Sequence, residues 1–274
     1  MRPPTVVTDL MLPRGDGATI AVSLHHPRTT ASHVAVLCPG YLDSKDYRHL
    51  VQLAHALAAR GWLTARFDPS GTWASGGDLR AHSLSRTIDD MRTVLAHLLT
   101  QGPATRVLVG GHSRGGEVSL QVAAREARVT DVLGLMPSWA PPARAQRRRW
   151  QSTGRRTSVR DDPGGGPSRR FSVPYAYCVD RDAYDTRATV AGLRDRRLMF
   201  FAGADDPVVP ATEVRALADA VGAAARFEVL PGIDHDFRHD AVATARVVTA
   251  CLAAIAPTRR GRQGARESRS GVDR

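Results

Sequence analysis

Three residues far apart in the chain have the side chains that nucleophilic acyl transfer requires: Ser113, Asp206 and His235. A serine hydroxyl is a weak nucleophile near neutral pH, so it needs a base to take its proton and an acid to orient that base. These three residues predict an acyl-enzyme mechanism in which His235 activates Ser113 and Asp206 holds the tautomer of His235. The expected reaction is hydrolysis of a carboxylic ester.

The serine lies in the sequence Gly-His-Ser-Arg-Gly-Gly at residues 111–116. The apolar run Arg106–Val109 before it predicts a buried strand, and Glu117–Glu126 after it has the spacing of an amphipathic helix. A serine on a sharp turn from strand to helix projects its oxygen above the edge of a sheet. Gly111 and Gly115 fit such a turn, because a larger side chain would clash where two backbone segments approach closely.

The acid and the base are expected on loops that follow two later strands. Asp206 comes after the expected strand Leu198–Ala202 and directly before a proline, which stiffens its loop; the neighbouring Asp205 is the alternative. His235 lies between the expected strand Phe227–Leu230 and the last helix. The carboxyl ends of parallel strands share one edge of a sheet, which is where such a sheet gathers its site.

Two backbone N–H groups are expected to stabilise the oxyanion that forms during acyl transfer. One belongs to Arg114, the residue after the nucleophile. The other is expected at Tyr41, in the loop Pro39–Ser44, where Gly40 supplies the conformational freedom for a tight turn. The alternative is that Pro39–Ser44 is an ordinary connection between a strand and a helix.

A third loop, Phe67–Asp78, is expected at the same edge of the sheet. Its glycines and Asp68 indicate a shaped turn that supports the site without contributing a catalytic group. Trp73 either lines the acyl pocket or packs in the interior, and the sequence leaves both open. His112, next to the serine, is expected to pack under the turn, with a second base as the alternative.

Short apolar runs alternate with longer amphipathic segments, which is typical of a mostly parallel sheet covered by helices. The segments His49–Ala59, Ser83–Leu99 and Val242–Ile255 each gather apolar residues on one side and are expected to be helices. Eight strands are expected, at Val6–Leu12, Thr19–Leu24, Val34–Cys38, Leu63–Phe67, Arg106–Val109, Val132–Met136, Leu198–Ala202 and Phe227–Leu230.

The length of 274 residues favours one catalytic domain, expected over residues 1–256. The segment from 137 to about 195 breaks the alternating pattern with prolines, glycines and clustered arginines. A segment of this size after the sixth strand predicts a cap or lid over the site, part of it mobile. Residues 257–274 are basic and lack apolar periodicity, so a disordered tail is expected.

The formal net charge is +11, from 38 Lys and Arg against 27 Asp and Glu. Lys45 is the sole lysine, and this arginine bias together with abundant Ala, Gly and Pro indicates a coding bias rather than selected recognition. No nucleic-acid motif with interleaved aromatic residues accompanies the charge, so no nucleic-acid partner is expected. The alternative is that the basic tail tethers the protein to nucleic acid or anionic lipid.

The three cysteines, Cys38, Cys178 and Cys251, are odd in number and widely spaced. This pattern argues against a disulfide framework or a metal site and favours a reducing cytoplasm. The first residues contain no apolar signal segment, and no run of about 18 apolar residues occurs, so neither export nor a membrane span is expected. The expected mechanism needs no metal and no organic cofactor.

Five sequence segments together resemble the α/β-hydrolase superfamily. They are Cys38-Pro-Gly-Tyr41, Asp68-Pro-Ser-Gly71 with Ser75-Gly76, Gly111-His-Ser-Arg-Gly-Gly116, Gly203-Ala-Asp-Asp-Pro-Val-Val-Pro210 and Gly232-Ile-Asp-His235. The chain looks closest to small intracellular esterases of the cinnamoyl/feruloyl-esterase and serine-aminopeptidase-like group, over most of residues 5–255.

The resemblance implies the α/β-hydrolase fold, a mostly parallel eight-stranded sheet flanked by helices. It also implies a triad of Ser113, Asp206 and His235, with the amides of Tyr41 and Arg114 as the oxyanion hole. Many relatives carry a histidine before the glycine of the oxyanion loop, where this chain has Pro39.

Several alternatives share this pattern of residues, because the triad sets the mechanism while the pocket sets the substrate. A thioesterase or another acyl hydrolase, acting on acyl-CoA, a lactone or a peptide, is one class. A non-catalytic protein that uses the same fold to bind a ligand is another. The arginines of the cap are expected to be solvated charge, with recognition of a substrate carboxylate or of coenzyme A phosphates as the alternative.

Overall fold

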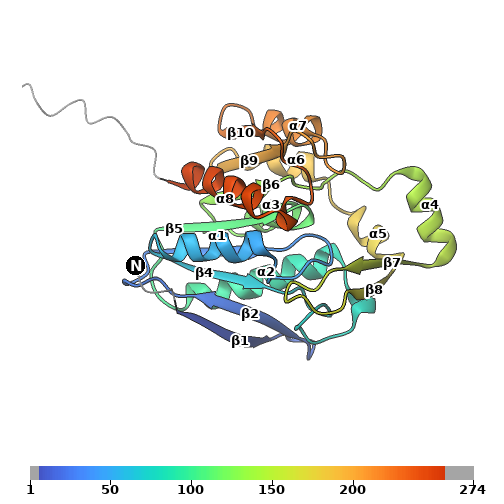
Figure 1. Cartoon of the computed structure of the whole chain (residues 1–274), viewed down its shortest axis with the longest axis horizontal. Coiled ribbons are helices and arrows are strands. Elements are labelled where there is room, and N and C mark those ends of the chain that lie inside the picture. Colours follow the sequence, from blue (N-terminus) through green and yellow to red (C-terminus); the bar gives the residue numbers. More distant parts are fainter. Residues whose placement is uncertain (1–5, 257–274) are drawn as a thin grey trace, which may run out of the picture.

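The computed structural model describes residues 6–256, and its centre is an eight-stranded sheet (Figure 1). The strand order is β1-β2-β4-β3-β5-β6-β9-β10. The strands are β1 (Val7–Pro13), β2 (Thr19–His25), β3 (His33–Cys38), β4 (Trp62–Phe67), β5 (Arg106–His112), β6 (Asp131–Leu135), β9 (Arg197–Gly203) and β10 (Ala225–Leu230). The prediction of eight strands in one sheet is confirmed.

The sheet is antiparallel at one edge and parallel everywhere else. Strand β2 runs antiparallel to both β1 and β4, and every pair from β4–β3 to β9–β10 is parallel. Strand β5 continues further than its apolar run predicts, because Gly110 and Gly111 stay in register with β3 and β6 as far as the serine turn. The carboxyl ends of six parallel strands therefore lie along one edge.

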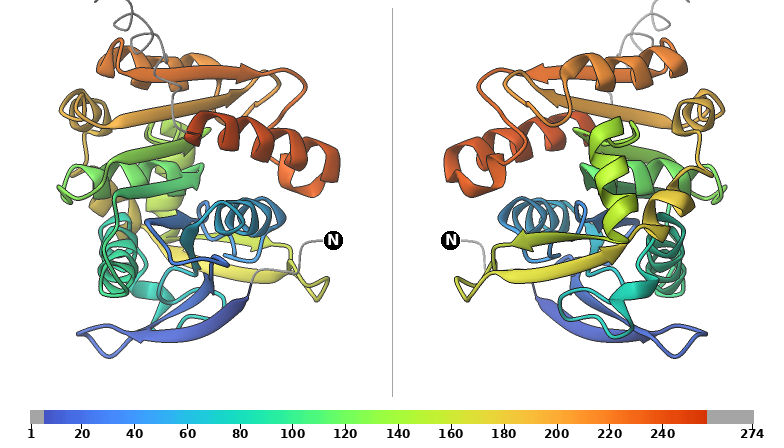
Figure 2. Two further views of the ribbon diagram at one scale, coloured as in Figure 1. Left: turned by 90° about the vertical axis from the view of Figure 1, so that its left-hand side faces the viewer. Right: turned by 90° about the vertical axis from the view of Figure 1, so that its right-hand side faces the viewer.

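Helices cover both faces of the sheet (Figure 2). The helices α1 (Arg48–Ala58) and α8 (Ala241–Ile255) lie together on one face. The other face carries α2 (Leu84–Leu99), α3 (Arg114–Ala123), α6 (Thr186–Ala191) and α7 (Ala211–Val221). The three long amphipathic helices predicted from the sequence correspond to α1, α2 and α8.

The helix after the serine differs from its predicted bounds. It begins at Arg114, directly after Ser113, and ends at Ala123 rather than Glu126. The start lies earlier because the glycines at 115 and 116 allow the first helical turn to pack against neighbouring backbone. A helix that begins at Arg114 directs its amino-terminal N–H groups toward Ser113.

The segment between β6 and β9 contains its own helices and a β-hairpin. It includes α4 (Arg144–Thr153), the antiparallel pair β7 (Arg155–Arg160) and β8 (Arg169–Pro174), and α5 (Ala176–Arg181). Figure 1 shows these four elements together beyond one end of the sheet. Helix α6, the last of the predicted 137–195 insertion, instead packs on α3 and α7.

A small apolar cluster holds this segment against the loop after β3. It is separate from the main core and consists of Leu42, Trp150, Phe171, Val173, Tyr177 and Cys178. The contact joins a loop of the sheet edge to α4, β8 and α5. The predicted disordered tail, residues 257–274, lies outside the described residues.

All three cysteines are buried and unbonded to one another. Within residues 6–256, no helix combines the length and the apolar character that crossing a membrane requires.

The central strands are buried on both faces, as expected for a parallel sheet between two helical layers. Phe200 on β9 is completely buried, and a Cβ added to Gly134 on β6 would lie 3.0 Å from its ring. The ring therefore occupies the space that the neighbouring glycine leaves. This packing fixes the spacing of β6 and β9, whose ends support the site.

We expect Phe200→Ala to lower the free energy of unfolding by about 3–5 kcal/mol, because it leaves a cavity between two central strands. Urea denaturation followed by circular dichroism measures the change. Val242→Ala, at a side chain that is 70% exposed, serves as the control and should stay within about 0.5 kcal/mol of the parent. Equal effects of the two substitutions would contradict this account of the core.

Candidate active site

Ser113, His235 and Asp206 lie together at the carboxyl ends of β5, β10 and β9. The Nε2 atom of His235 lies 3.0 Å from Ser113 Oγ, and Nδ1 lies 2.7 Å from Asp206 Oδ2. All three residues are buried. The side chains form one continuous row of hydrogen-bonding distances from carboxylate to hydroxyl.

The structure brings Asp206, and not Asp205, to the histidine. Asp206 Oδ1 accepts hydrogen bonds from the N–H groups of Val208 and Val209, both at 2.8 Å. Asp205 is exposed, and its own N–H donates to Ile233 O at 3.1 Å. Two backbone donors therefore hold the Asp206 carboxylate while its second oxygen faces His235.

Ser113 occupies a strained backbone conformation, with φ 53° and ψ −119°. For a residue with a side chain this costs of the order of 1–3 kcal/mol and persists only where the surroundings enforce it. The Ser113 N–H donates to Leu135 O at 2.8 Å, and the Ser138 N–H donates to Ser113 O at 3.0 Å. These two bonds hold the turn from both sides.

The turn also packs backbone against backbone. A Cβ at Gly111 would lie 2.5 Å from Cys38 O, and one at Gly115 would overlap the same oxygen and lie 2.5 Å from Pro39 O. The start of α3 therefore presses directly on the end of β3 and on the loop after it. Only glycine at both positions permits this approach.

The residues whose amides are expected to form an oxyanion hole lie beside Ser113. Tyr41 and Arg114 line the same cavity as Ser113. A Cβ on the preceding Gly40 would come within 3.5 Å of Ser113 Cβ, which shows how near the loop runs. Within residues 6–256, neither the Tyr41 N–H nor the Arg114 N–H takes part in a hydrogen bond of a turn or loop.

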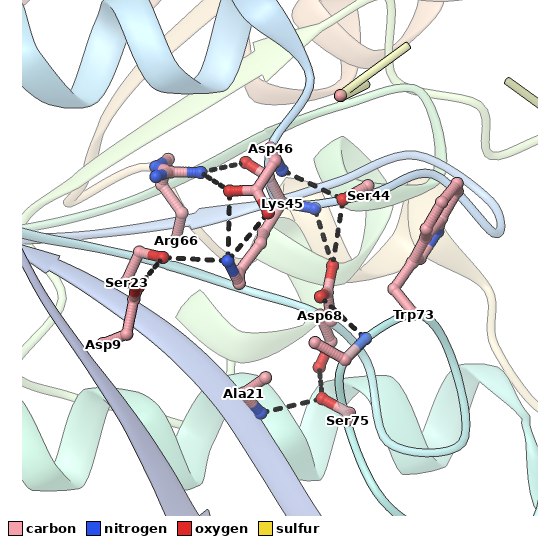
Figure 3. A network of polar contacts seen from close by, with 12 residues as sticks. Asp9, Ala21, Ser23, Ser44, Lys45, Asp46, Arg66, Asp68, Trp73 and Ser75 are labelled. Carbon is pink, nitrogen blue, oxygen red and sulfur yellow. Dashed lines mark hydrogen bonds and ion pairs between the residues drawn. The ribbon is translucent and has the colours of Figure 1, made fainter. Parts of the chain in front are cut away.

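A buried polar network anchors the loop that carries Tyr41 (Figure 3). Asp68 accepts from Lys45 N at 2.7 Å through one oxygen and from Ala74 N at 3.2 Å through the other. Burial raises the pKa of Asp68 to about 6, against the lowering effect of these donors. Asp68 thus connects the loop after β3 to the loop after β4.

The lysine side chain extends the network toward β2. Lys45 Nζ donates to Ser23 Oγ and to Asp46 Oδ2, both at 2.9 Å, and Arg66 Nη1 donates to Asp46 Oδ1 at 2.7 Å. Figure 3 shows these groups as one connected set. The following helix α1 has Tyr47 at its N-cap without a side-chain capping bond, so this loop does more than lead into a helix.

Trp73 lies away from the nucleophile. Its Nε1 donates to Leu42 O at 2.9 Å, and its ring packs on Phe171 of β8 with centroids 5.5 Å apart. It is not among the residues that line the cavity at Ser113. The structure therefore favours a packing role for Trp73, against the hairpin of β7 and β8, over a role in lining the acyl pocket.

His112 packs behind the site. Its ring centroid lies 4.6 Å from that of His235, and it also contacts His49 and Phe237. Burial lowers the pKa of His112 well below its ordinary value. A neutral ring in van der Waals contact with His235 fits the expected packing role.

An open cavity of about 830 Å³ lies above Ser113 and His235. Its walls come from the sheet-edge loops and from the segment between β6 and β9, which we call the cap after its predicted role. The cap side consists of Ser138, Ala140, Pro141, Pro142, Ala143, Gln146, Trp150, Arg156, Val159, Arg160, Asp161, Tyr177, Cys178 and Arg181. A cavity of this size suits a small-molecule ligand.

Asp43 and Arg160 are site residues for which the sequence gives no signal. Arg160 Nε donates to Asp43 Oδ1 at 2.9 Å, and its Nη2 donates to Tyr41 O at 2.9 Å. Burial raises the pKa of Asp43, which the Arg238 and Arg160 guanidiniums partly offset. The pair joins β7 of the cap to the loop of Tyr41, a contact between segments more than a hundred positions apart.

Known proteins resemble this chain in sequence and in fold. The family model described as "Serine aminopeptidase, S33" matches residues 29–158. The monoacylglycerol lipase of Mycolicibacterium smegmatis is 32% identical over 111 residues, which make up 40% of this chain and 39% of that protein. The match thus spans well under two thirds of that curated relative.

Solved structures resemble the chain over nearly its whole length. GrgF, an α/β hydrolase from Penicillium sp. sh18, has a TM-score of 0.74 and 16% identity, covering 91% of this chain and 97% of its own. Est1E of Butyrivibrio proteoclasticus with ferulic acid bound has a TM-score of 0.72 and 21% identity, covering 90% and 100%. These likenesses confirm the α/β-hydrolase fold that the sequence motifs imply.

We expect Gly115→Ala to lower the free energy of unfolding by about 3 kcal/mol, since the new methyl group overlaps two backbone carbonyls that have no room to move. Thermal or urea unfolding measures the change. Gly192→Ala is the matched control, because a Cβ there meets nothing closer than 3.4 Å, and it should be nearly neutral. Unchanged stability of Gly115→Ala would show that the elbow is less tightly packed.

Proposed function

Because the chain has the α/β-hydrolase fold and matches the serine aminopeptidase model over residues 29–158, we propose that it is a serine hydrolase that cleaves a carboxylic ester. The single observation that carries this proposal is the row of contacts from Asp206 through His235 to Ser113, at 2.7 and 3.0 Å. The strained backbone at Ser113 supports it, since such strain is retained where function needs it.

Acylation begins when Ser113 Oγ attacks the ester carbonyl carbon and its proton passes to His235 Nε2. The carbonyl oxygen becomes an oxyanion, which accepts hydrogen bonds from the N–H groups of Tyr41 and Arg114. Asp206 stabilises the imidazolium through Nδ1. The protonated Nε2 then gives its proton to the departing alcohol oxygen as the bond between carbon and alcohol breaks, leaving an acyl group on Ser113.

Deacylation repeats these steps with water. His235 takes a proton from water, whose oxygen attacks the acyl carbon, and the same two amides hold the oxyanion. Return of the proton to Ser113 Oγ releases the carboxylic acid. Every proton moves through one imidazole, and the chain's own groups supply each step.

An ester is favoured over the other acyl substrates by two relatives. The curated relative that matches 111 residues is named a monoacylglycerol lipase, and the similar structure of Est1E has ferulic acid bound. Cleavage of a thioester, a lactone or a peptide uses the same three side chains and the same mechanism, so these substrates are the alternatives. A non-catalytic binding protein is less well supported, because ligand binding alone requires neither the aligned triad nor the strained serine.

The proposal extends to the organisation of the chain. Residues 1–256 form the hydrolase domain, and the insertion from 137 to about 195 contributes the cap. The substrate is a small-molecule ester or thioester, and a cytoplasmic location fits three buried cysteines with free thiols.

We expect Ser113→Ala to lower kcat/KM for a 4-nitrophenyl ester at least about 10³-fold, since the nucleophile is lost. A fluorophosphonate probe should label the parent protein and leave the variant unlabelled. The matched control is Ser138→Ala, which removes another hydroxyl lining the same cavity and should retain activity within a fewfold. Parent-like hydrolysis by Ser113→Ala would overturn the mechanism, and absence of labelling in the parent would favour a binding protein.

The anchoring network leads to a second expectation. Asp68→Asn replaces one of two carboxylate acceptors with an NH₂ group that faces a backbone donor, so it shifts the loop of Tyr41. We expect kcat for a 4-nitrophenyl ester to fall at least about tenfold, because small displacements near the reacting atoms are costly. KM should change much less, since Asp68 lies outside the cavity.

The control for this substitution lies in the same network. Asp9 accepts from Ser23 Oγ at its far end, and Asp9→Asn should leave kcat within twofold of the parent. A similar loss of kcat in both variants would assign Asp68 a general structural role rather than one in positioning the loop.

A further inference from the structure

Five arginines line the cavity above the nucleophile: Arg114, Arg156, Arg160, Arg181 and Arg238. Guanidinium groups inside a cavity are ordinarily paired with carboxylates, because an isolated charge is costly to remove from water. Whether each arginine has a carboxylate of its own therefore decides what charge a ligand meets there.

Two of the five are neutralised by single carboxylates. Arg160 pairs with Asp43 at 2.9 Å, and Arg238 pairs with Asp236 at 2.6 Å. Both acids also line the cavity. These pairs leave little net charge for a ligand.

Arg114 and Arg181 share one carboxylate. Both guanidiniums contact Oε2 of the buried Glu117, Arg181 at 3.4 Å, and Thr186 Oγ1 donates to Glu117 Oε1 at 2.7 Å. Two cations and one anion leave one positive charge in the wall beside Ser113. In keeping with this crowding, burial and the neighbouring Arg114 lower the pKa of Arg181.

Arg156 has no carboxylate within 4 Å among residues 6–256. With the Gln146 amide assigned so that its oxygen faces the guanidinium, this oxygen accepts from Nη1 at 3.0 Å and from Nη2 at 3.2 Å, and the guanidinium lies over the Trp150 ring at 5.7 Å. Both neighbours line the cavity with it. A neutral amide and an aromatic face orient the guanidinium while leaving its charge uncompensated.

Two carboxylates on the cavity wall, Asp161 and Glu213, have no ion pair among the described residues. Asp161 is exposed and accepts from Ser168 Oγ at 3.0 Å, which places it at the rim. Burial raises the pKa of Glu213, and the positive charge of the nearby Arg181 lowers it. Neither offsets Arg156.

We propose that Arg156 binds a carboxylate carried by the substrate, so that the enzyme hydrolyses esters with an anionic group in the acyl or the alcohol part. This inference rests on the proposed ester hydrolysis. A planar guanidinium matches a carboxylate with two parallel hydrogen bonds, and Gln146 and Trp150 hold its plane in the wall. The adjacent rings of Trp150 and Tyr177 stack with centroids 5.8 Å apart and form an aromatic surface for the part of the substrate between the carboxylate and the ester.

This assignment sets the cavity apart from one made for a long acyl chain. A long hydrocarbon chain gains from an apolar tunnel, whereas here the guanidinium of Arg156 would have to lose water without new hydrogen bonds. A carboxylate regains those bonds. The excess arginine charge thus selects a short, charged ester over a lipid.

Two pairs of matched esters test the proposal. The first compares mono(4-nitrophenyl) glutarate with 4-nitrophenyl pentanoate, which differ by a carboxylate on the acyl part. The second compares 4-(butanoyloxy)benzoate with phenyl butanoate, which differ by a carboxylate on the alcohol part. In at least one pair, the parent should have the higher kcat/KM for the anion, and Arg156→Gln should lower that value about tenfold or more while changing the neutral ester less than twofold.

The neighbouring residue supplies a charge-matched control. Arg155 belongs to the same strand but is exposed and absent from the cavity wall. Arg155→Gln changes the net charge equally and should leave both esters of each pair unaffected. An equal loss in Arg155→Gln and Arg156→Gln, or equal loss on charged and neutral esters in Arg156→Gln, would overturn the proposal.

Binding without turnover separates this inference from the proposed function. In Ser113→Ala, monomethyl glutarate and methyl 4-carboxybenzoate are titrated by calorimetry with and without Arg156→Gln. At least one should bind, with at least fivefold weaker affinity when Arg156 is replaced. If neutral esters are hydrolysed and neither binding nor hydrolysis depends on Arg156, the carboxylate site is wrong and the proposed function stands. If the acids bind in an Arg156-dependent way and no ester is hydrolysed, the proposed function is wrong and the carboxylate site stands. Absence of binding by both acids would count against the carboxylate site.

Discussion

The close approach of the first turn of α3 to the end of β3 is the constraint on which the rest of the site depends. Carbonyl oxygens of Cys38 and Pro39 occupy the space where side chains at 111 and 115 would otherwise lie. This contact places the start of α3 and the loop of Tyr41 on the two sides of Ser113. One steric fit between two backbones thus holds the strained φ of Ser113 and positions the two amides that the proposed mechanism uses.

The loop beside the serine is held by polar contacts on one side and by the cap on the other. Asp68 and Lys45 fix its far end to β2 and β4, while Arg160 binds its carbonyl group at Tyr41 from β7. Buried charged groups of this kind lose much when one partner is removed, because the remaining charge stays unpaired. The loop is therefore held at both ends by groups that tolerate little change. Such rigidity is what preorganised oxyanion donors require.

Much of the sheet could be predicted because buried parallel strands appear as continuous apolar runs, as in Leu198–Ala202. The loops of Asp206 and His235 directly follow two of these strands, so the sequence also predicts that both side chains lie at the same sheet edge as Ser113. The structure places them there. The contact of Arg160 with Asp43 could not be predicted, because it joins distant segments whose pairing only the folded cap creates. Helix α4 could not be predicted from apolar periodicity either, because Trp150 is its only buried residue and the helix has no apolar stripe.

The hairpin of β7 and β8 connects the proposed carboxylate site to the loop beside Ser113. Side chains alternate along a strand, so Arg156 and Arg160, four positions apart on β7, share one face. Arg156 lines the cavity and has no carboxylate partner within residues 6–256, and Arg160 holds the carbonyl of Tyr41. A ligand that draws Arg156 toward it acts on the same strand that holds the loop of Tyr41, which supplies an oxyanion donor in the proposed mechanism. Binding energy from a remote substrate group can thereby be used at the reacting carbonyl, where it accelerates the chemical step rather than only tightening binding.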